Sequence, residues 1–337
     1  MPSSTNVLPV GVIGCGRMGR LHARVLSQMP AVKLIGVADA NPQSAEEAAK
    51  LYGCEAFTDP LKLLPRVKAV TIAVPTQFHV CSSEPFLRAG IACLIEKPLA
   101  KDVGECRRIV ELARASNTTV QVGHIERFNP AVRALFALDL NPTFIEVVRV
   151  SPMTFRSIDV GVVLDMMIHD LDIVLKLAGS PVTRVEAVGG SVVGTVEDVC
   201  NARVTFANGC VANITASRLA AGSERRLRVF SGNGFASVDY ATKRGAIIRR
   251  GERLDVIREA IAKVRAGESV DLSGLKPEDL MKVEPLKVDD QDQLRAEQES
   301  FIDAVITGSR PLVTAEDGAA AVDLATQIVH AIRPQTL

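Results

Sequence analysis

The stretch PVGVIGCGRMGRLHARVLSQM at residues 9–29 decides the fold of the N-terminal half. Its apolar beginning predicts a buried strand, and the residues after the third glycine follow the spacing of a helix. Between them stand Gly14, Gly16 and Gly19, in a GxGxxG pattern that requires a strand before it and a helix after it. The first glycine permits the tight turn, the second admits a pyrophosphate to the backbone, and the third lets helix and strand pack closely. The stretch predicts a dinucleotide-binding turn, with Arg17 and Met18 at the helix start as further cofactor contacts.

Asp39 ends the next apolar run, KLIGVAD at residues 33–39. A carboxylate in this position accepts hydrogen bonds from the adenosine ribose and repels a ribose 2′-phosphate. The residues that follow, 40–42, include no Arg or Lys to compensate. The sequence therefore predicts NAD rather than NADP as the cofactor.

Short apolar runs alternate with helical patterns from residue 9 to about residue 122. The runs at 68–74, 92–96 and 118–123 are apolar almost throughout, whereas a strand with one wet face would alternate. Strands buried on both faces and separated by helices indicate a parallel sheet with helices on each side. We predict an α/β Rossmann domain over residues 1–123.

The pattern changes after about residue 125, which predicts a second domain over residues 124–337. Helical patterns at 130–138 and 161–177 and a strand at 144–150 precede strand-like runs between 185 and 250, separated by turn signals such as Asn208-Gly209 and Asn233-Gly234. We predict an α+β domain with a large, mostly antiparallel open sheet, and an excursion at the sheet's edge over residues 251–289. Two helices follow, near 290–307 and 315–332, and the last can pack back on the first domain.

Composition limits the partners and the compartment. The chain has 337 residues, and its 39 basic and 39 acidic side chains cancel, so no general field attracts nucleic acid or an anionic membrane. Seven cysteines, an odd number without CxxC pairs, indicate buried thiols in a reducing compartment. The start resembles no secretory leader, and no apolar run reaches the length of a membrane span. We expect a soluble cytoplasmic protein that binds neither nucleic acid nor membrane.

Lys97 follows the strand that ends at Glu96, at the carboxyl edge of the sheet where open α/β folds bind their ligands. An ammonium there can polarise a substrate hydroxyl and favour an alkoxide-like transition state. The alternative is an ordinary solvated lysine in a strand–helix loop.

A polar stripe interrupts the apolar helical stretch GVVLDMMIHDLD at residues 161–172. Asp165, His169 and Asp172 are spaced i, i+4 and i+7, on one face of a regular helix. An imidazole is suited to take a hydroxyl proton as hydride leaves, and Asp165 can bind a substrate hydroxyl or tune His169. The alternative is a core histidine with aspartates on the helix surface. We expect no metal, because neither HExxH nor a zinc-spaced cluster of Cys and His occurs.

Four motifs together resemble the glucose-fructose oxidoreductase and inositol dehydrogenase family (Gfo/Idh/MocA): GCGRMG at 14–19, AVPTQFH at 73–79, EKP at 96–98 and DMMIHDLD at 165–172. The resemblance covers essentially the whole chain. It implies that Lys97 and His169 are the catalytic pair, that Asp165 is their substrate-binding neighbour, and that the Lys97-Pro98 bond is cis. It also implies further residues along the cofactor, namely Pro75, Thr76, His79 and Glu96.

GHIERFNP at 123–130 and DVGVVLDMMIHDLDI at 159–173 look like the subgroup that oxidises UDP-N-acetylglucosamine, or its uronic acid, at the 3-hydroxyl with NAD. In that picture Arg127 and Asn129 lie near the sugar. Arginines of the second half are candidates for the diphosphate, or else ordinary sheet-surface charges: Arg149, Arg156, Arg218 and Arg225. The open sheet of this family commonly forms the oligomer interface, which implies a homodimer or homotetramer.

Alternative functions stay open, since a scaffold does not fix its chemistry. Within enzymes they are an inositol or free-sugar dehydrogenase, a NAD-assisted glycosidase, or a reductase working in the reverse direction. A non-catalytic NAD-binding regulator is the alternative from a different class, and the presence of Lys97, Asp165 and His169 argues against it.

Overall fold

The computed structural model describes residues 7–138, 140–154, 159–193, 195–232, 234–251, 254–270, 276 and 281–334. The chain forms two compact units, each made from separate stretches of sequence. The first comprises Met1–Phe128, Val163–Leu175 and Gln291–His330, and the second comprises Asn129–Val162, Lys176–Asp290 and Ala331–Leu337. These units are groups of contacting residues, so the division into domains at residues 123 and 124 stays a prediction.

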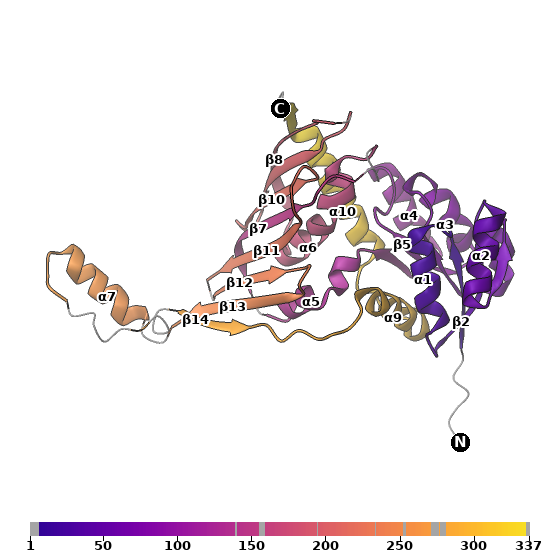
Figure 1. Cartoon of the computed structure of the whole chain (residues 1–337), viewed down its shortest axis with the longest axis horizontal. Helices are drawn as coiled ribbons and strands as arrows, with labels where there is room; N and C mark the ends of the chain where they lie inside the picture. The colour runs from indigo at the N-terminus through magenta and orange to yellow at the C-terminus, as the bar shows by residue number, and fades with distance from the viewer. Residues whose placement is uncertain are drawn as a thin grey trace, which may run out of the picture. The chain divides into compact units, whose positions relative to one another are not determined.

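The first unit contains a six-stranded parallel sheet in the order β3-β2-β1-β4-β5-β6, of which Figure 1 labels β2 and β5. This is the strand order of dinucleotide-binding folds, so the predicted Rossmann architecture is confirmed. The strands are β1 (Leu8–Ile13), β2 (Val32–Ala38), β3 (Glu55–Phe57), β4 (Ala69–Ile72), β5 (Ala92–Glu96) and β6 (Val120–Gly123). The short β3 was not predicted, because its three residues form no apolar run and are largely exposed.

Helices cover both faces of this sheet and bury two apolar cores. One core joins the sheet to α1, α2 and α9 through residues such as Val12, Leu26 and Phe301. The other joins it to α3, α4 and α10 through residues such as Ile72 and Val322. The helices are α1 (Arg17–Ser27), α2 (Pro42–Tyr52), α3 (His79–Arg88), α4 (Val103–Ala115), α9 (Gln293–Thr307) and α10 (Ala315–Ala331), with 3-10 turns at Pro60–Arg66, Thr76–Phe78 and Ile125–Phe128. The two terminal helices predicted from the sequence are confirmed.

The second unit contains a nine-stranded sheet in the order β14-β13-β12-β11-β7-β10-β9-β8-β15 (Figure 1). Only β7 with β10 and β8 with β15 are parallel neighbours among the described strands, so the mostly antiparallel sheet is confirmed. The strands are β7 (Pro142–Val150), β8 (Val182–Gly190), β9 (Val199–Phe206), β10 (Val211–Ser217), β11 (Glu224–Ser231), β12 (Gly234–Asp239), β13 (Arg244–Arg250), β14 (Met281–Pro285) and β15 (Ile332–Pro334). Buried and half-buried residues alternate along the central strands, so one face is covered and the other is open.

The predicted hairpin at Asn208-Gly209 is confirmed, because it joins β9 to the antiparallel β10. Gly209 has a φ of 85°, but Asn208 is not among the residues of positive φ, so the turn is not the type I′ turn that an Asn-Gly pair favours. Asn233 lies outside the described residues. The excursion at 251–289 contains α7 (Leu254–Arg265) and the edge strand β14, and the unit also holds α5 (Pro130–Phe136). Among the described residues, no helix is both long and apolar enough to cross a membrane.

Candidate active site

The turn between β1 and α1 has the backbone that the glycine pattern predicts. Gly14 has a φ of 95°, in the left-handed region that favours glycine. A Cβ on Gly19 would lie 1.8 Å from the Gly14 carbonyl oxygen, so helix and strand leave no room for a side chain there. A Cβ on Gly16 would meet nothing within 4 Å, and Gly16, Arg17 and Met18 surround the start of α1 with at least partial exposure. This open cradle at a helix N-terminus fits the pyrophosphate of a dinucleotide.

Asp39 lies beside this cradle and is held by two backbone amides. Its Oδ2 accepts a hydrogen bond from Cys15 N at 2.6 Å, and its Oδ1 accepts one from Asn41 N at 2.9 Å. Each carboxylate oxygen has a second lone pair that can accept from a ribose hydroxyl. The carboxylate therefore fits the ribose diol of NAD and would repel the 2′-phosphate of NADP.

His79 joins the loop after β4 to the turn after β5. It is 1 % exposed, and its Nε2 lies 3.0 Å from the Val74 carbonyl oxygen while its Nδ1 lies 3.0 Å from the Pro98 carbonyl oxygen. Burial lowers the pKa of His79, although these carbonyls oppose the shift. In the same loop, Pro75 is exposed and Thr76 is half-buried. Cofactor contacts of all three stay predictions.

Lys97 lies at the carboxyl end of β5, and the Lys97-Pro98 peptide bond is cis, as the resemblance implied. The Lys97 Nζ donates a hydrogen bond to the Asp165 carbonyl oxygen at 2.8 Å and lies 3.6 Å from Asp165 Oδ1. The two side chains are 19 % and 35 % exposed, so solvent and small molecules can reach them. The structure thus brings together two predicted site residues from distant parts of the sequence.

A π-helical turn, Val163–Met167, carries Asp165, and α6 (Ile168–Ala178) begins directly after it. The sequence predicted one regular helix with a single polar face, but i→i+5 bonding in this turn changes the angle between Asp165 and the residues of α6. Asp165 and His169 are partly exposed, whereas Asp172 is 1 % exposed. The predicted stripe is therefore divided into an accessible pair and a buried aspartate.

Arg127 and Asp172 form a buried ion pair. Arg127 is 3 % exposed, and its Nε and Nη2 each donate to one oxygen of the Asp172 carboxylate at 2.7 Å. Such bidentate pairs are strong and directional, so this one fixes α6 against the segment after β6. The predicted contact of Arg127 with the sugar stays a prediction.

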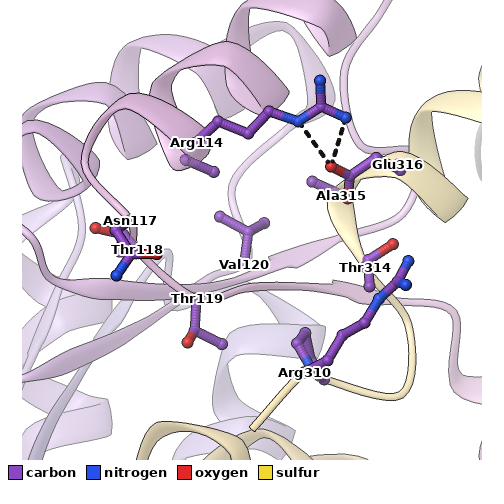
Figure 2. A pocket seen from close by; sticks show the side chains of 11 residues that line it. Arg114, Asn117, Thr118, Thr119, Val120, Arg310, Thr314, Ala315 and Glu316 are labelled. Carbon is purple, nitrogen blue, oxygen red and sulfur yellow. Dashed lines mark hydrogen bonds and ion pairs between the residues drawn. The ribbon is translucent and has the colours of Figure 1, made fainter. Parts of the chain in front are cut away.

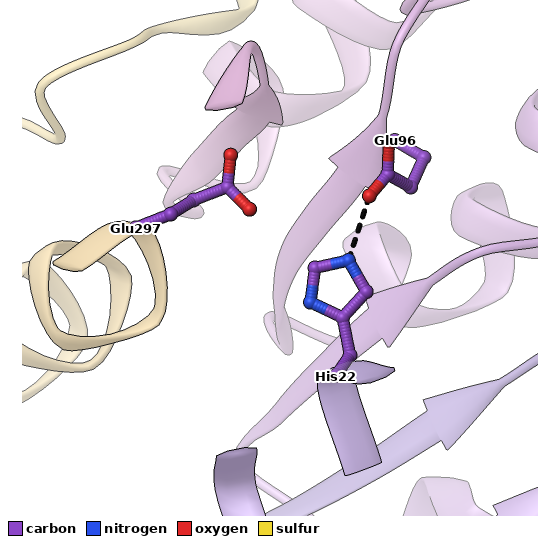
Figure 3. Close-up of side chains that lie close together, drawn as sticks. All are labelled: His22, Glu96 and Glu297. Atoms are coloured by element: carbon purple, nitrogen blue, oxygen red, sulfur yellow. Dashed lines mark hydrogen bonds and ion pairs between the residues drawn. The ribbon is translucent and has the colours of Figure 1, made fainter. Parts of the chain in front are cut away.

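The motifs did not reveal three buried polar residues beside the Lys97 turn. His22 on α1 faces Glu96, and Glu297 on α9 points toward both (Figure 3). His124 follows β6, is fully buried, and neither of its ring nitrogens has a hydrogen-bond partner among the described residues. Burial lowers the pKa of His124, and the nearby Asp172 opposes the shift. A polar residue on the apolar face of a helix is the signal that could have identified His22 and Glu297.

Glu96, predicted to contact the cofactor, directs its carboxylate to His22. The Glu96 Oε1 and His22 Nε2 are 2.7 Å apart, and both residues are buried. The predicted contact of Glu96 with the cofactor stays a prediction. In the protein interior, Glu96 pairs with His22.

The predicted substrate-binding residues of the second unit are held by the protein itself. Asn129 is 1 % exposed, accepts the Ala131 N–H at 3.1 Å and donates to the Tyr240 carbonyl at 3.1 Å. The buried Arg149 lies over the Tyr240 ring, 5.2 Å from its centroid. Arg156 lies outside the described residues.

The other two arginines differ in their surroundings. Arg218 is buried beside Asp198, with its Nε 3.7 Å from Asp198 Oδ1, whereas Arg225 on β11 is exposed. A contact of any of these arginines with a diphosphate stays a prediction.

A cavity of about 450 Å³ in the first unit contains none of the predicted site residues (Figure 2). It lies at the amino end of β6, where Arg114 and Glu316 form an exposed ion pair at 2.9 Å. Open α/β sheets bind ligands at the carboxyl ends of their strands, so we do not assign this cavity to the active site.

Comparison with family models gives matches in both halves of the chain. Residues 8–124 match the GFO/IDH/MocA oxidoreductase family, NAD-binding Rossmann fold. Residues 148–237 match the GFO/IDH/MocA C-terminal domain.

Individual relatives include dehydrogenases of sugars and of inositol. UDP-N-acetylglucosamine 3-dehydrogenase of Acidithiobacillus ferrooxidans is 36 % identical over 305 residues, covering 90 % of this chain and 90 % of that protein. A solved structure of the enzyme of that name from the same organism has a TM-score of 0.85, with 33 % identity over 96 % of this chain and 97 % of that chain. Inositol 2-dehydrogenase of Rhizobium meliloti is 31 % identical over 247 residues, covering 68 % of this chain and 74 % of that protein.

Proposed function

The chain belongs to the GFO/IDH/MocA oxidoreductase family, and on that premise we propose that it oxidises the 3-hydroxyl of UDP-N-acetylglucosamine or a related UDP-sugar to a ketone, using NAD. The observation that carries this proposal is the contact of Lys97 with Asp165, 2.8 Å from Nζ to the carbonyl oxygen, at the carboxyl edge of the nucleotide-binding sheet. The similarity to a UDP-N-acetylglucosamine 3-dehydrogenase over 90 % of the chain supports the choice of substrate.

Lys97 is proposed to polarise the reacting hydroxyl. An ammonium carries three N–H donors, so Lys97 is able to donate to a substrate oxygen as well as to the Asp165 carbonyl oxygen. Its charge favours the alkoxide that develops as the C–H bond breaks. The Asp165 carboxylate, 3.6 Å from Nζ, can accept a hydrogen bond from a neighbouring hydroxyl of the substrate.

His169 is proposed to accept the hydroxyl proton. It stands on the first turn of α6, directly after the π-helical turn that contacts Lys97, and is partly exposed. A neutral imidazole near physiological pH is a suitable base for this step.

The cradle of residues 14–19 and Asp39 would hold NAD, which would supply the acceptor for the hydride. On the substrate side, Arg127 and Asn129 stay our candidates for the sugar, and Arg156 stays a candidate for the diphosphate. We also propose that the protein is cytoplasmic, since all seven of its cysteines are free thiols, and that it assembles as a homodimer or homotetramer.

The first test is to replace the two proposed catalytic side chains. Lys97→Ala and His169→Ala should each lower kcat by about 100- to 10,000-fold, because positioned acid and base groups contribute that much. Affinity for NAD, measured by calorimetry, should change little. Lys101→Ala is the matched control, since Lys101 lies four residues on, is 55 % exposed and pairs only with Glu105 among the contacts described. Unchanged kcat in both site variants would remove Lys97 and His169 from the mechanism.

An inositol or free-sugar dehydrogenase is the second candidate, favoured by the similarity to inositol 2-dehydrogenase. The purified protein should be incubated with NAD and a panel of UDP-sugars, inositols and free sugars while the absorbance of NADH is followed. We expect turnover of a UDP-sugar. Turnover of a polyol alone would favour the second candidate.

A further inference from the structure

A buried group of polar side chains lies directly behind the Lys97 turn. One atom from each of His22, Glu96 and Glu297 lies within 4.8 Å of the others, and Glu297 extends from α9 toward the His22–Glu96 pair (Figure 3). Gln298 on the same helix contacts His22 Nδ1, and its Nε2 lies 3.5 Å from the Thr71 hydroxyl. The group therefore links α1, β4, β5 and α9 inside the first unit.

This group holds two carboxyl groups but has only one partner for a negative charge. Glu96 is hydrogen-bonded to His22, whereas neither carboxyl oxygen of Glu297 has a hydrogen-bond partner among the described residues. Burial raises the pKa of Glu297 well above its ordinary value, and the nearby Glu96 raises it further. Burial also acts to raise the pKa of Glu96, but the hydrogen bond and charge of His22 outweigh it and the net shift is downward. Glu297 is therefore the neutral acid and Glu96 the carboxylate.

The geometry favours a proton over a metal cation as the neutralising species. Ligands about 2.0–2.2 Å from a divalent ion lie roughly 3 Å or more from each other. The His22 Nε2 and Glu96 Oε1 are 2.7 Å apart, which is the length of a direct charge-assisted hydrogen bond. A cation shared by these two atoms would require them to separate.

The group is coupled to Lys97 through the backbone. The Glu96 Oε2 accepts the Lys97 N–H at 3.2 Å, so the carboxylate that His22 holds also holds the amide of the next residue. Beside it, a Cβ on Gly123 would lie 3.1 Å from Glu96 Cα, which means that β6 packs tightly against this turn. Successive residues of a strand point to opposite sides, and the Lys97 side chain accordingly extends to Asp165.

We propose that His22 and Glu297 are positioning residues for Lys97: with Glu96 they form a buried group in which Glu96 is the one ionised carboxyl group, and this group fixes the backbone from which the Lys97 ammonium extends. This proposal rests on the function proposed above, in which Lys97 acts on the substrate. Neither residue touches substrate or cofactor in this role. The group acts only through the position of the lysine.

The neighbours of the group define what else can titrate there. Besides its own members, the titratable side chains that interact electrostatically with Glu96 are Lys97 and the buried His79 and His124. Gln298 is the neighbour on α9 itself and carries no charge. If the titration of Glu297 makes the stability of the protein depend on pH, that dependence should therefore disappear when Glu297 alone is replaced by a neutral side chain.

The activity test uses pairs of variants at each position. Glu297→Gln imitates the neutral acid in size and charge, so kcat should stay within about threefold of the wild type, whereas Glu297→Ala should lower it by about tenfold or more, the range for residues that orient a functional group. His22→Ala should lower kcat by about 10- to 100-fold with KM and NAD affinity little changed, and His22→Gln, which keeps a donor for Glu96, should restore most of it. Asp303→Asn on the exposed side of α9 is the control.

The second test follows the proton itself and does not need a substrate. Because the folded state holds a proton on Glu297 that the unfolded state loses above its ordinary pKa of 4.5, the folding equilibrium of the wild type should fall with rising pH, by up to about tenfold per pH unit, until the pKa of the folded state is passed. Glu297→Gln should lack this fall. The infrared C=O band of a protonated carboxylic acid should likewise be present in the wild type and absent in the variant.

Several outcomes would overturn the proposal. They are equal losses of activity in Glu297→Gln and Glu297→Ala, unchanged kcat in a folded His22→Ala, or a stoichiometric divalent metal in the purified protein that Glu297→Gln removes. Failure of the wild type to oxidise any sugar would instead overturn the proposed function, and the infrared and unfolding measurements would still report on the charge of the group.

Discussion

Gly16 and Gly19 stand three residues apart and differ in the space around them, so a side chain should have different effects at the two positions. Space around Gly16 is open, and its φ of −67° suits any residue, so Gly16→Ala should fold with unchanged stability. The added methyl group would nevertheless extend into the cradle for the pyrophosphate, and we expect NAD affinity to fall by at least tenfold. Gly19→Ala would place a Cβ 1.8 Å from the Gly14 oxygen, and it should destabilise the protein outright.

Thermal unfolding without cofactor, together with calorimetric titration of NAD, distinguishes the two effects. A Gly16→Ala protein that binds NAD as tightly as the wild type would show that the cofactor does not approach this backbone. A Gly19→Ala protein as stable as the wild type would mean that α1 is packed less closely on β1 than described.

At this scale the sequence predicted residues whose signal is local. The order of strand, turn and helix was enough to predict the roles of Gly14, Gly19 and Asp39. The place of Lys97 at the end of a strand was enough to predict it as a site residue. His22 and Glu297 could not be found in this way, because their meaning depends on α9 packing beside α1, a contact between residues 276 positions apart in the case of His22 and Gln298. Long-range contacts of this kind leave no periodic pattern in the sequence.

Helix α9 is important for the proposed site because it places Glu297 and Gln298 in the interior of the first unit. Its N-cap is Asp292, whose side chain accepts the Arg295 N–H at 2.9 Å. Loss of an N-cap costs about 1 kcal/mol, so Asp292→Ala should lower the melting temperature by about 2–4 °C. The exposed Asp290, two residues earlier, provides the control in Asp290→Ala. An equal effect of the two substitutions would show that the cap contributes nothing.

The secondary structure was predictable in kind but not in every detail. Apolar runs and turn residues identified most strands and both terminal helices, since these patterns reflect burial. The π-helical turn at Val163–Met167 was missed, because the hydrophobic spacing of residues 161–177 is that of a regular helix. Its geometry is stabilised by contacts with other elements, among them the hydrogen bond from Lys97, which the local sequence does not encode.

The open face of the nine-stranded sheet is the candidate interface of the proposed homo-oligomer. Phe230 on β11 lies on this face between Phe144 and Phe235, with ring centroids 5.4 Å and 4.5 Å away, and is 36 % exposed. Exposed aromatic clusters of this kind mark interaction surfaces. If a second copy of the chain covers this face, Phe230→Asp should shift the protein toward the monomer in analytical ultracentrifugation.

Leu51→Asp is the control for this experiment, because Leu51 is an apolar residue of α2 that is 66 % exposed and far from the sheet in sequence. Dissociation by both substitutions, or by neither, would argue against the sheet as the site of assembly.

The first unit gathers residues from three parts of the chain, ending with Gln291–His330. A ribosome that adds about 5–20 residues per second needs roughly 10–40 s to proceed from residue 128 to residue 330. Until α9 and α10 have been synthesised, the nascent nucleotide-binding sheet lacks both helices. The apolar surfaces that Phe301 and Val322 later cover are exposed to solvent during this time. The cofactor-binding half, although its sheet is synthesised first, thus cannot be completed until almost the whole chain has been made, and until then its partly exposed core is a target for chaperones.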